Sequence, residues 1–250
     1  MQHLILNLEA PLMSFGGETI DNLGVIRPFP AASMLTGLLA NALGWRRVER
    51  ERHQQLQDRL VFAARIDREP HGGFTTQDFQ SAAINNTEQN WTTRGRPEGR
   101  GGGTYQNHLR YRDYYADMQV TVALRLKPPG DGPALDDLAT ALQEPQRPLF
   151  IGRKPCLPSC RLYGGYAEGD TALAALLAWP LAEGPEPPTL VRALWPEGEG
   201  APGVVASRSF MLTDQRNWVS GLHGGGRPVC QAAIARDRFA PAPPEEEGQP

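Results

Sequence analysis

Alternating apolar and polar residues predict three strands in the first half of the chain, over residues 3–9, 61–67 and 117–126. Leu4, Leu6 and Leu8 share one face of the first strand, and Ile5 belongs to the opposite face. This pattern is typical of a strand inside a sheet. Shorter strands are expected at residues 190–195, 204–212 and 218–219.

Apolar residues at helical spacing predict a helix over residues 31–43, which Gly44 ends. Its apolar face comprises Met34, Leu35, Leu38, Leu39, Ala42 and Leu43. Gly37 lies inside this helix, where glycine costs ~1 kcal/mol relative to alanine. Close packing, or the close approach of a ligand, would explain it. Further helices are expected at residues 46–59, 135–144 and 171–179, the last capped by Asp170.

The element order β-α-β-β-α-β over the first 155 residues or so predicts an α+β protein built on a ferredoxin-like unit. Within that span, the last strand falls on the apolar run 149–151. Residues 68–115 show no convincing periodicity and form an insertion between the second and third strands. A connection this long is usually functional or disordered. Residues 241–250 have the composition of a disordered acidic tail.

Positive charge is concentrated locally, although the 250-residue chain carries a formal net charge of −3. Five arginines and one acid, Glu98, lie between residues 94 and 112. A second cluster, over residues 147–161, contains no acid. Lys127 and Lys154 are the only lysines, so most of the positive charge is guanidinium, which suits bidentate phosphate contacts. Two basic clusters on a mildly acidic protein indicate a bounded groove for nucleic acid rather than a general nucleic-acid coat.

Four features are candidate nucleic-acid contacts. Arg27 precedes a helix that begins near Ser33, whose free N–H groups would favour a phosphate. A glycine-rich basic loop follows at residues 94–103. Interleaved arginine and tyrosine at residues 110–112 are able to pair phosphates and stack bases. Gly152 permits close backbone approach beside Arg153 and Lys154, the sharpest local site in the chain.

Other site classes have little support. Three cysteines and no secretion signal argue against a disulfide framework, and zinc would lack ligands beside Cys156 and Cys160, which are expected to be buried. The chain has no catalytic motif and no apolar run of membrane-spanning length, so no cofactor, metal or membrane partner is expected, and the compartment is expected to be the cytoplasm.

Two further functions stay open. One is a metal-independent endoribonuclease, for which Tyr105, His108, Tyr111 and Lys154 are candidate acids and bases. The other is a protein-binding scaffold whose basic clusters meet acidic partner surfaces.

The chain resembles the Cas-five family of the type I-E CRISPR complex Cascade, in segments that keep the order and spacing of the family. These segments are LILNLEAPLMSFG, RPFPAASMLTGLLANALGW, HLRYRDYYADMQVTVALRL, RPLFIGRKPCLP and SRSFMLTDQRNWV. The resemblance implies an RRM-like (RAMP) palm with a small β-rich C-terminal part, over residues 1–67 and 116–240, and a thumb over residues 68–115. The glycine-rich residues 99–103 depart from the family pattern.

The resemblance also implies a function and partners. Members of the family bind the 5′ handle of the CRISPR RNA, and join the backbone subunit (CasC) to the large subunit (CasA) for recognition of target DNA. Cleavage of precursor RNA belongs to another subunit, except in the type I-C branch, whose catalytic tyrosine, lysine and histidine are not assigned here. The residues expected near the handle are Arg27, Ser33, Arg110, Tyr111, Arg112, Gly152, Arg153 and Lys154.

Overall fold

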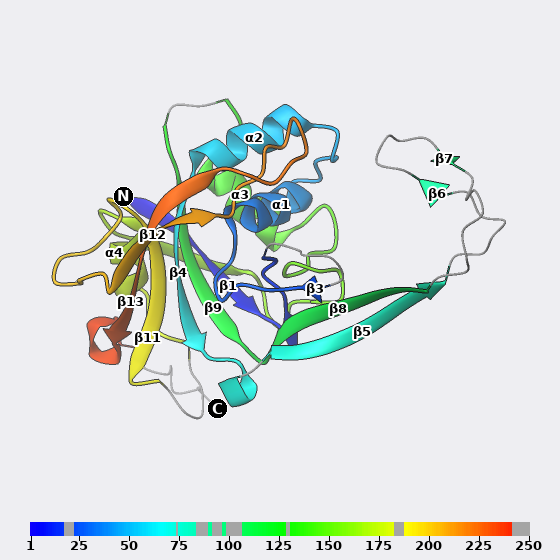
Figure 1. The fold of residues 1–250 in the computed structure, drawn as a ribbon. Coiled ribbons are helices and arrows are strands. Elements are labelled where there is room, and N and C mark those ends of the chain that lie inside the picture. The colour runs from blue at the N-terminus through cyan, green and yellow to red at the C-terminus, as the bar shows by residue number, and fades with distance from the viewer. Residues whose placement is uncertain are drawn as a thin grey trace, which may run out of the picture.

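The computed structural model describes residues 1–17, 23–73, 75–83, 90–91, 97–98, 107–128, 131–182 and 188–241. In this part of the chain, four α-helices accompany a seven-stranded, a four-stranded and a two-stranded sheet. The protein is therefore mixed α/β and mostly β (Figure 1). No helix within these residues is long and apolar enough to cross a membrane.

The seven-stranded sheet is the centre of the molecule, and its neighbouring strands are antiparallel. Its order is β10-β1-β9-β4-β11-β13-β12. In chain order these strands are β1 (Gln2–Glu9), β4 (Leu60–Arg68), β9 (Gln119–Leu126), β10 (Tyr163–Glu168), β11 (Leu190–Pro196), β12 (Arg208–Thr213) and β13 (Gly226–Ala235). The three strands predicted in the first half of the chain are confirmed as β1, β4 and β9.

Helices cover both faces of this sheet. One face carries α1 (Ala32–Ala42), α2 (Arg50–Arg59) and α3 (Leu135–Gln143), and the other carries α4 (Ala172–Ala178). Leu4, Leu6 and Leu8 pack into the core beneath the first three helices, whereas Ile5 packs with α4. The predicted alternation of β1 is therefore confirmed, because each set of side chains faces its own helical layer.

The last strand of the predicted ferredoxin-like unit lies later in the chain than predicted. Residues 149–151 do not form a strand, because the chain turns here: Gly152 has a φ of 90°, and Ile151 N donates to Cys156 O at 2.8 Å. The strand that follows α3 is instead β10, paired with β1.

A long β-ribbon projects from the body of the molecule (Figure 1). It consists of β5 (Thr75–Ala83) and β8 (Asn107–Ala116), and the base of β8 also pairs with β2 (Leu12–Met13) and β3 (Leu23–Gly24). β6 (Asn90–Trp91) and β7 (Pro97–Glu98) form a separate pair. The sequence prediction missed β5 because its residues 75–81 are all exposed, so no buried face imposes an alternating pattern.

Other predictions need smaller corrections. Residues 218–219 are not a strand but belong to the connection between β12 and β13. The Thr171 hydroxyl, rather than Asp170, caps α4 by accepting from Ala174 N at 3.1 Å. Cys156 is buried as predicted, but Cys160 is exposed. The glycine-rich residues 99–103, and residues 242–250 of the acidic tail, lie outside the described part of the chain.

Candidate nucleic-acid groove

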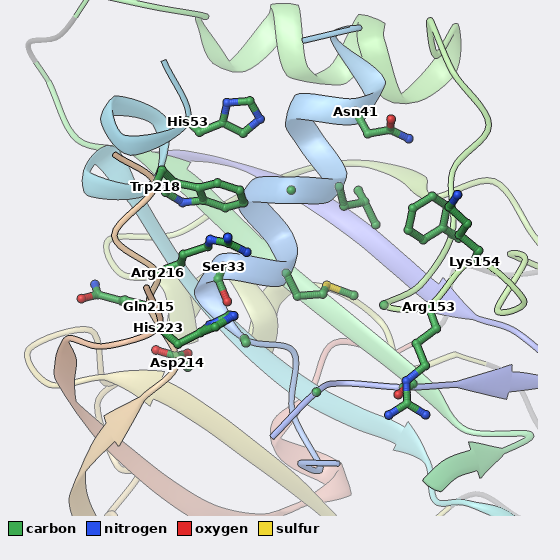
Figure 2. A pocket seen from close by; sticks show the side chains of 18 of the residues that line it. Ser33, Asn41, His53, Arg153, Lys154, Asp214, Gln215, Arg216, Trp218 and His223 are labelled. Carbon is green, nitrogen blue, oxygen red and sulfur yellow. The ribbon is translucent and has the colours of Figure 1, made fainter. Parts of the chain in front are cut away.

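One face of α1 forms the wall of a groove with a volume of about 1370 Å³. Ala31, Ser33, Met34, Gly37, Leu38 and Asn41 follow one another along this wall. The turn around residues 147–154 borders the groove on one side, and the connection between β12 and β13 borders it on the other. Figure 2 shows Lys154 and Arg153 on one side of α1, and Arg216 and Trp218 on the other.

The groove is strongly cationic. Seven of its lining side chains are basic: Arg27, Arg47, Arg112, Arg147, Arg153, Lys154 and Arg216. The one acid among the described lining residues is Asp214, and its carboxylate is paired with Arg227, which donates from Nε at 3.0 Å and from Nη2 at 2.8 Å. The excess positive charge is therefore not neutralised from within this lining, and the groove attracts anions although the whole chain is acidic.

The structure brings six of the eight predicted contact residues into this groove. They are Arg27, Ser33, Arg112, Gly152, Arg153 and Lys154, and they come from segments far apart in the sequence. Arg110 and Tyr111 lie further out on the ribbon and do not line the groove. Tyr111 packs against Phe79 of β5, with the ring centroids 5.4 Å apart, and Arg110 is exposed. That any of the eight contacts RNA stays a prediction.

The start of α1 is not the free phosphate site that the sequence suggested. Ala32 N donates to a carboxylate oxygen of Asp214 at 3.0 Å, and Ser33 N donates to the Asp214 carbonyl at 3.0 Å. The next two N–H groups, of Met34 and Leu35, donate to Ala31 O. Arg27 and Ser33 line the groove, but the start of α1 offers no free N–H group there. The cap comes from a residue 182 positions away, so local sequence carried no signal for it.

Gly152 is required by the protein itself rather than by a ligand. Its φ of 90° is a conformation that favours glycine, and a Cβ at this position would lie 1.7 Å from Ser14 O. The chain therefore passes directly over the 14–17 loop at this point. The resulting turn leaves the Lys154 side chain exposed beside the groove, and no described residue forms a hydrogen bond or ion pair with it.

Arg153 and Arg147 hold the borders of the groove together. Arg153 donates to Asp113 O and Gly24 O, both at 3.1 Å, and its guanidinium lies 5.0 Å from the ring centroid of Tyr114. These contacts tie the 147–154 turn to the base of the ribbon. Arg147 donates to Trp45 O and to Gly44 O at 2.8 Å, just beyond the end of α1, where a cation is favoured.

Sequence reasoning missed the side of the groove formed by Trp218. The Trp218 indole donates to Gln57 Oε1 at 3.0 Å, and its ring lies 4.8 Å from that of His53. Arg216 packs 5.3 Å from the same indole; burial lowers the pKa of its guanidinium, and the charge of Arg47 lowers it further. No local pattern could reveal this cluster, because the connection between β12 and β13 reaches α1 and α2 only in the folded chain.

These features define a mixed α/β protein with a cationic groove at the base of a projecting β-ribbon. The chain belongs to the CRISPR-associated protein family Cas_Cas5, whose family model matches residues 3–230. The resemblance stated from the sequence is therefore confirmed at the level of the family. The matched span includes every residue of the groove.

Individual relatives agree with this assignment. The CRISPR system Cascade subunit CasD of Escherichia coli (strain K12) is 28% identical over 176 residues, which cover 70% of this chain and 75% of the relative. A chain of a CRISPR RNA-guided surveillance complex has the same fold, with a TM-score of 0.64, 22% identity and coverage of 96% and 94% of the two chains. A structure described as a Cas protein gives a TM-score of 0.65 at 25% identity, over 97% and 100%.

Proposed function

We propose that this protein is a non-catalytic, RNA-binding subunit of a type I-E Cascade-like surveillance complex. In this proposal the groove beside α1 binds the 5′ handle of the CRISPR RNA in the cytoplasm. The protein then joins the backbone subunit (CasC) to the large subunit (CasA), so that the complex recognises target DNA. The observation that carries the proposal is the groove itself, in which seven basic side chains face one internally paired acid.

The arrangement of strands supports a ferredoxin-like palm. The chain order β1-α1-β4-β9-α3-β10 corresponds to β-α-β-β-α-β once α2 is set aside, and the sheet order β10-β1-β9-β4 places the first and third strands at the centre. We assign residues 1–67 and 116–240 to this palm and residues 68–115 to a thumb. The β5–β8 ribbon projects in the manner that such a thumb requires (Figure 1).

The chemistry of the groove fits single-stranded RNA better than an acidic protein surface. Met34 and Leu38 give the α1 wall apolar patches that suit bases and riboses, and cations lie on both sides of that wall. A chain of regularly spaced phosphates is able to pair with both sides while its bases lie against the helix. The volume of about 1370 Å³ leaves room for several nucleotides.

The proposal gives the protein no cleavage step, and the positions of the acid–base candidates support this. Lys154 lines the groove, whereas Tyr111 packs against Phe79 on the ribbon. His108 is paired with Ala82 towards the outer end of β8, and Tyr105 lies outside the described residues. A general base and acid have to meet at one 2′-hydroxyl, and of the two candidates whose side chains are described, Lys154 lines the groove and Tyr111 does not.

Lys154 provides a clean test of RNA binding. The Lys154→Gln variant should bind labelled CRISPR repeat RNA about threefold more weakly at 0.2 M salt, with a salt slope lower by about 0.7, as expected for one lost phosphate contact to a single strand. Lys127→Gln is the matched control, because it removes the same charge from an exposed site outside the groove. Equal affinity and equal slope for both variants would contradict the proposal.

The same RNA tests the endoribonuclease alternative. The full-length protein, incubated with labelled repeat RNA in EDTA, should leave the RNA intact. Metal-independent cleavage that disappears in His108→Ala would show instead that the protein is an enzyme.

A further inference from the structure

Arg47 and Arg216 form an uncompensated pair of cations at the Trp218 side of the groove. Burial lowers the pKa of the Arg216 guanidinium, and the neighbouring Arg47 charge lowers it further. Asp214, the acid among the described groove residues, is already held by Arg227 and by the start of α1. Both cations line the groove, and the described acid of that lining is already paired, so the repulsion between them favours the binding of an anion.

Arg216 also has an unused hydrogen-bond donor. Its Nη2 donates to Gly221 O at 3.0 Å, which fixes the direction of the side chain. Its Nε is buried and has no hydrogen-bond partner within the described part of the chain. Buried donors are normally satisfied, so the described part of the protein pairs this guanidinium only in part.

The surroundings of Arg216 are fixed before any ligand arrives. Trp218 supports the guanidinium from one side, and its indole is held in turn by Gln57 and by the ring of His53. Trp218 N also donates to Gln54 Oε1 at 2.9 Å, which attaches this connection to α2. Figure 2 shows Arg216, Trp218 and His53 stacked beside α1, opposite Lys154. A held guanidinium loses little side-chain freedom when an anion binds.

We propose that Arg47 and Arg216 together bind one phosphate of the RNA strand, as an anchor separate from the Lys154 side of the groove. A phosphodiester supplies a negative charge and hydrogen-bond acceptors for the two guanidinium groups, both of which line the groove. The strand then crosses the α1 wall from one cationic side to the other. This inference rests on the proposed RNA-binding function and adds a contact that neither the basic clusters of the sequence nor the family resemblance indicated.

Arg47→Gln tests the anchor, because Arg47 is exposed and no described residue forms a hydrogen bond or ion pair with its side chain. We expect binding of labelled repeat RNA to weaken about threefold at 0.2 M salt, with a salt slope lower by about 0.7. Arg46→Gln is the control, since it removes the same charge from the preceding position, which does not line the groove. If the two variants bind RNA alike, the anchor is refuted.

Arg47→Glu gives a second readout with the opposite sign. A carboxylate at residue 47 would attract Arg216, so the variant should unfold at a higher temperature than the wild type while binding RNA more weakly than Arg47→Gln. Unchanged RNA binding by Arg47→Glu would overturn the inference, whatever happens to stability.

Lys154→Gln, measured alongside, separates the two proposals. Loss of affinity there, with normal binding by both residue-47 variants, refutes only the anchor, whereas normal binding by all three variants contradicts RNA binding in the groove.

Discussion

Replacing Gly37 by alanine adds one methyl group to the wall of the groove, in the interior of α1. The added Cβ would lie 3.7 Å from Cη2 of Trp218, an ordinary van der Waals distance, with no other close neighbour among the described residues beyond the helix backbone. The fold therefore has room for alanine at this position. Helix propensity alone favours alanine by ~1 kcal/mol, which corresponds to a rise in Tm of about 2–4 °C for a protein of this size.

The effect of Gly37→Ala on binding should have the opposite sign. An RNA strand that lies against α1 would meet the new methyl group, and an inserted methyl in a close-packed contact costs about 1–3 kcal/mol. We expect an affinity loss of about tenfold, which corresponds to ~1.4 kcal/mol. Gly37→Ser should weaken binding further, because its side chain is larger.

Two measurements on the same samples test this reasoning. Thermal unfolding followed by circular dichroism reports stability, and fluorescence anisotropy with labelled repeat RNA reports affinity. Gln55→Ala, at an exposed position of α2 outside the groove, is the control and should leave affinity unchanged. If Gly37→Ala is stabilised but binds RNA as tightly as the wild type, RNA does not approach this part of α1. A lower Tm for Gly37→Ala would show that the space beside Trp218 is too small for a methyl group.

Two other predictions concern folding and pH. Gly152→Ala should lower the free energy of unfolding by more than 2 kcal/mol in urea titrations, because a Cβ would collide with Ser14 O and the positive φ is strained for alanine; a smaller loss would show that this turn relaxes easily. His3 is buried, and burial lowers its pKa below 6.5. As the pH falls below about 6.5, the unfolded chain therefore takes up a proton at this histidine before the folded protein does. The free energy of unfolding should decrease over the same pH range. His3→Asn should flatten that dependence of Tm on pH, and an unchanged slope would assign it to other groups.

Local patterns predicted the elements that pack into the cores on either side of the central sheet. β1, β4, β9, α1 and α3 were found because their apolar residues repeat at the period of a strand or a helix, against a core that imposes the period. The ribbon was missed because β5 is exposed over residues 75–81 and so has no such constraint. Residues 149–151 are apolar but form a turn: Ile151 packs into the main core, while its backbone pairs with Ser14 and Cys156 rather than with a neighbouring strand.

The site was predictable only in part, for a related reason. The 147–154 turn and Arg112 were visible as clusters of basic residues, and six of the eight predicted residues meet in one groove. The Asp214 cap on α1 and the Arg47–Arg216 pair were invisible, because each joins segments more than 160 residues apart. A single sequence contains no local pattern that brings such segments together.

Basic residues in this groove serve two purposes, which charge alone does not distinguish. Arg153 and Arg147 donate to backbone carbonyls and so maintain the shape of the groove. Lys154 and Arg47 lack hydrogen-bond and ion-pair partners among the described residues and remain available to a ligand. An alanine scan that measures RNA affinity alone would assign all four to RNA recognition. Removing a structural arginine should lower both Tm and affinity, whereas removing a ligand-binding cation should lower affinity and the salt slope without lowering Tm.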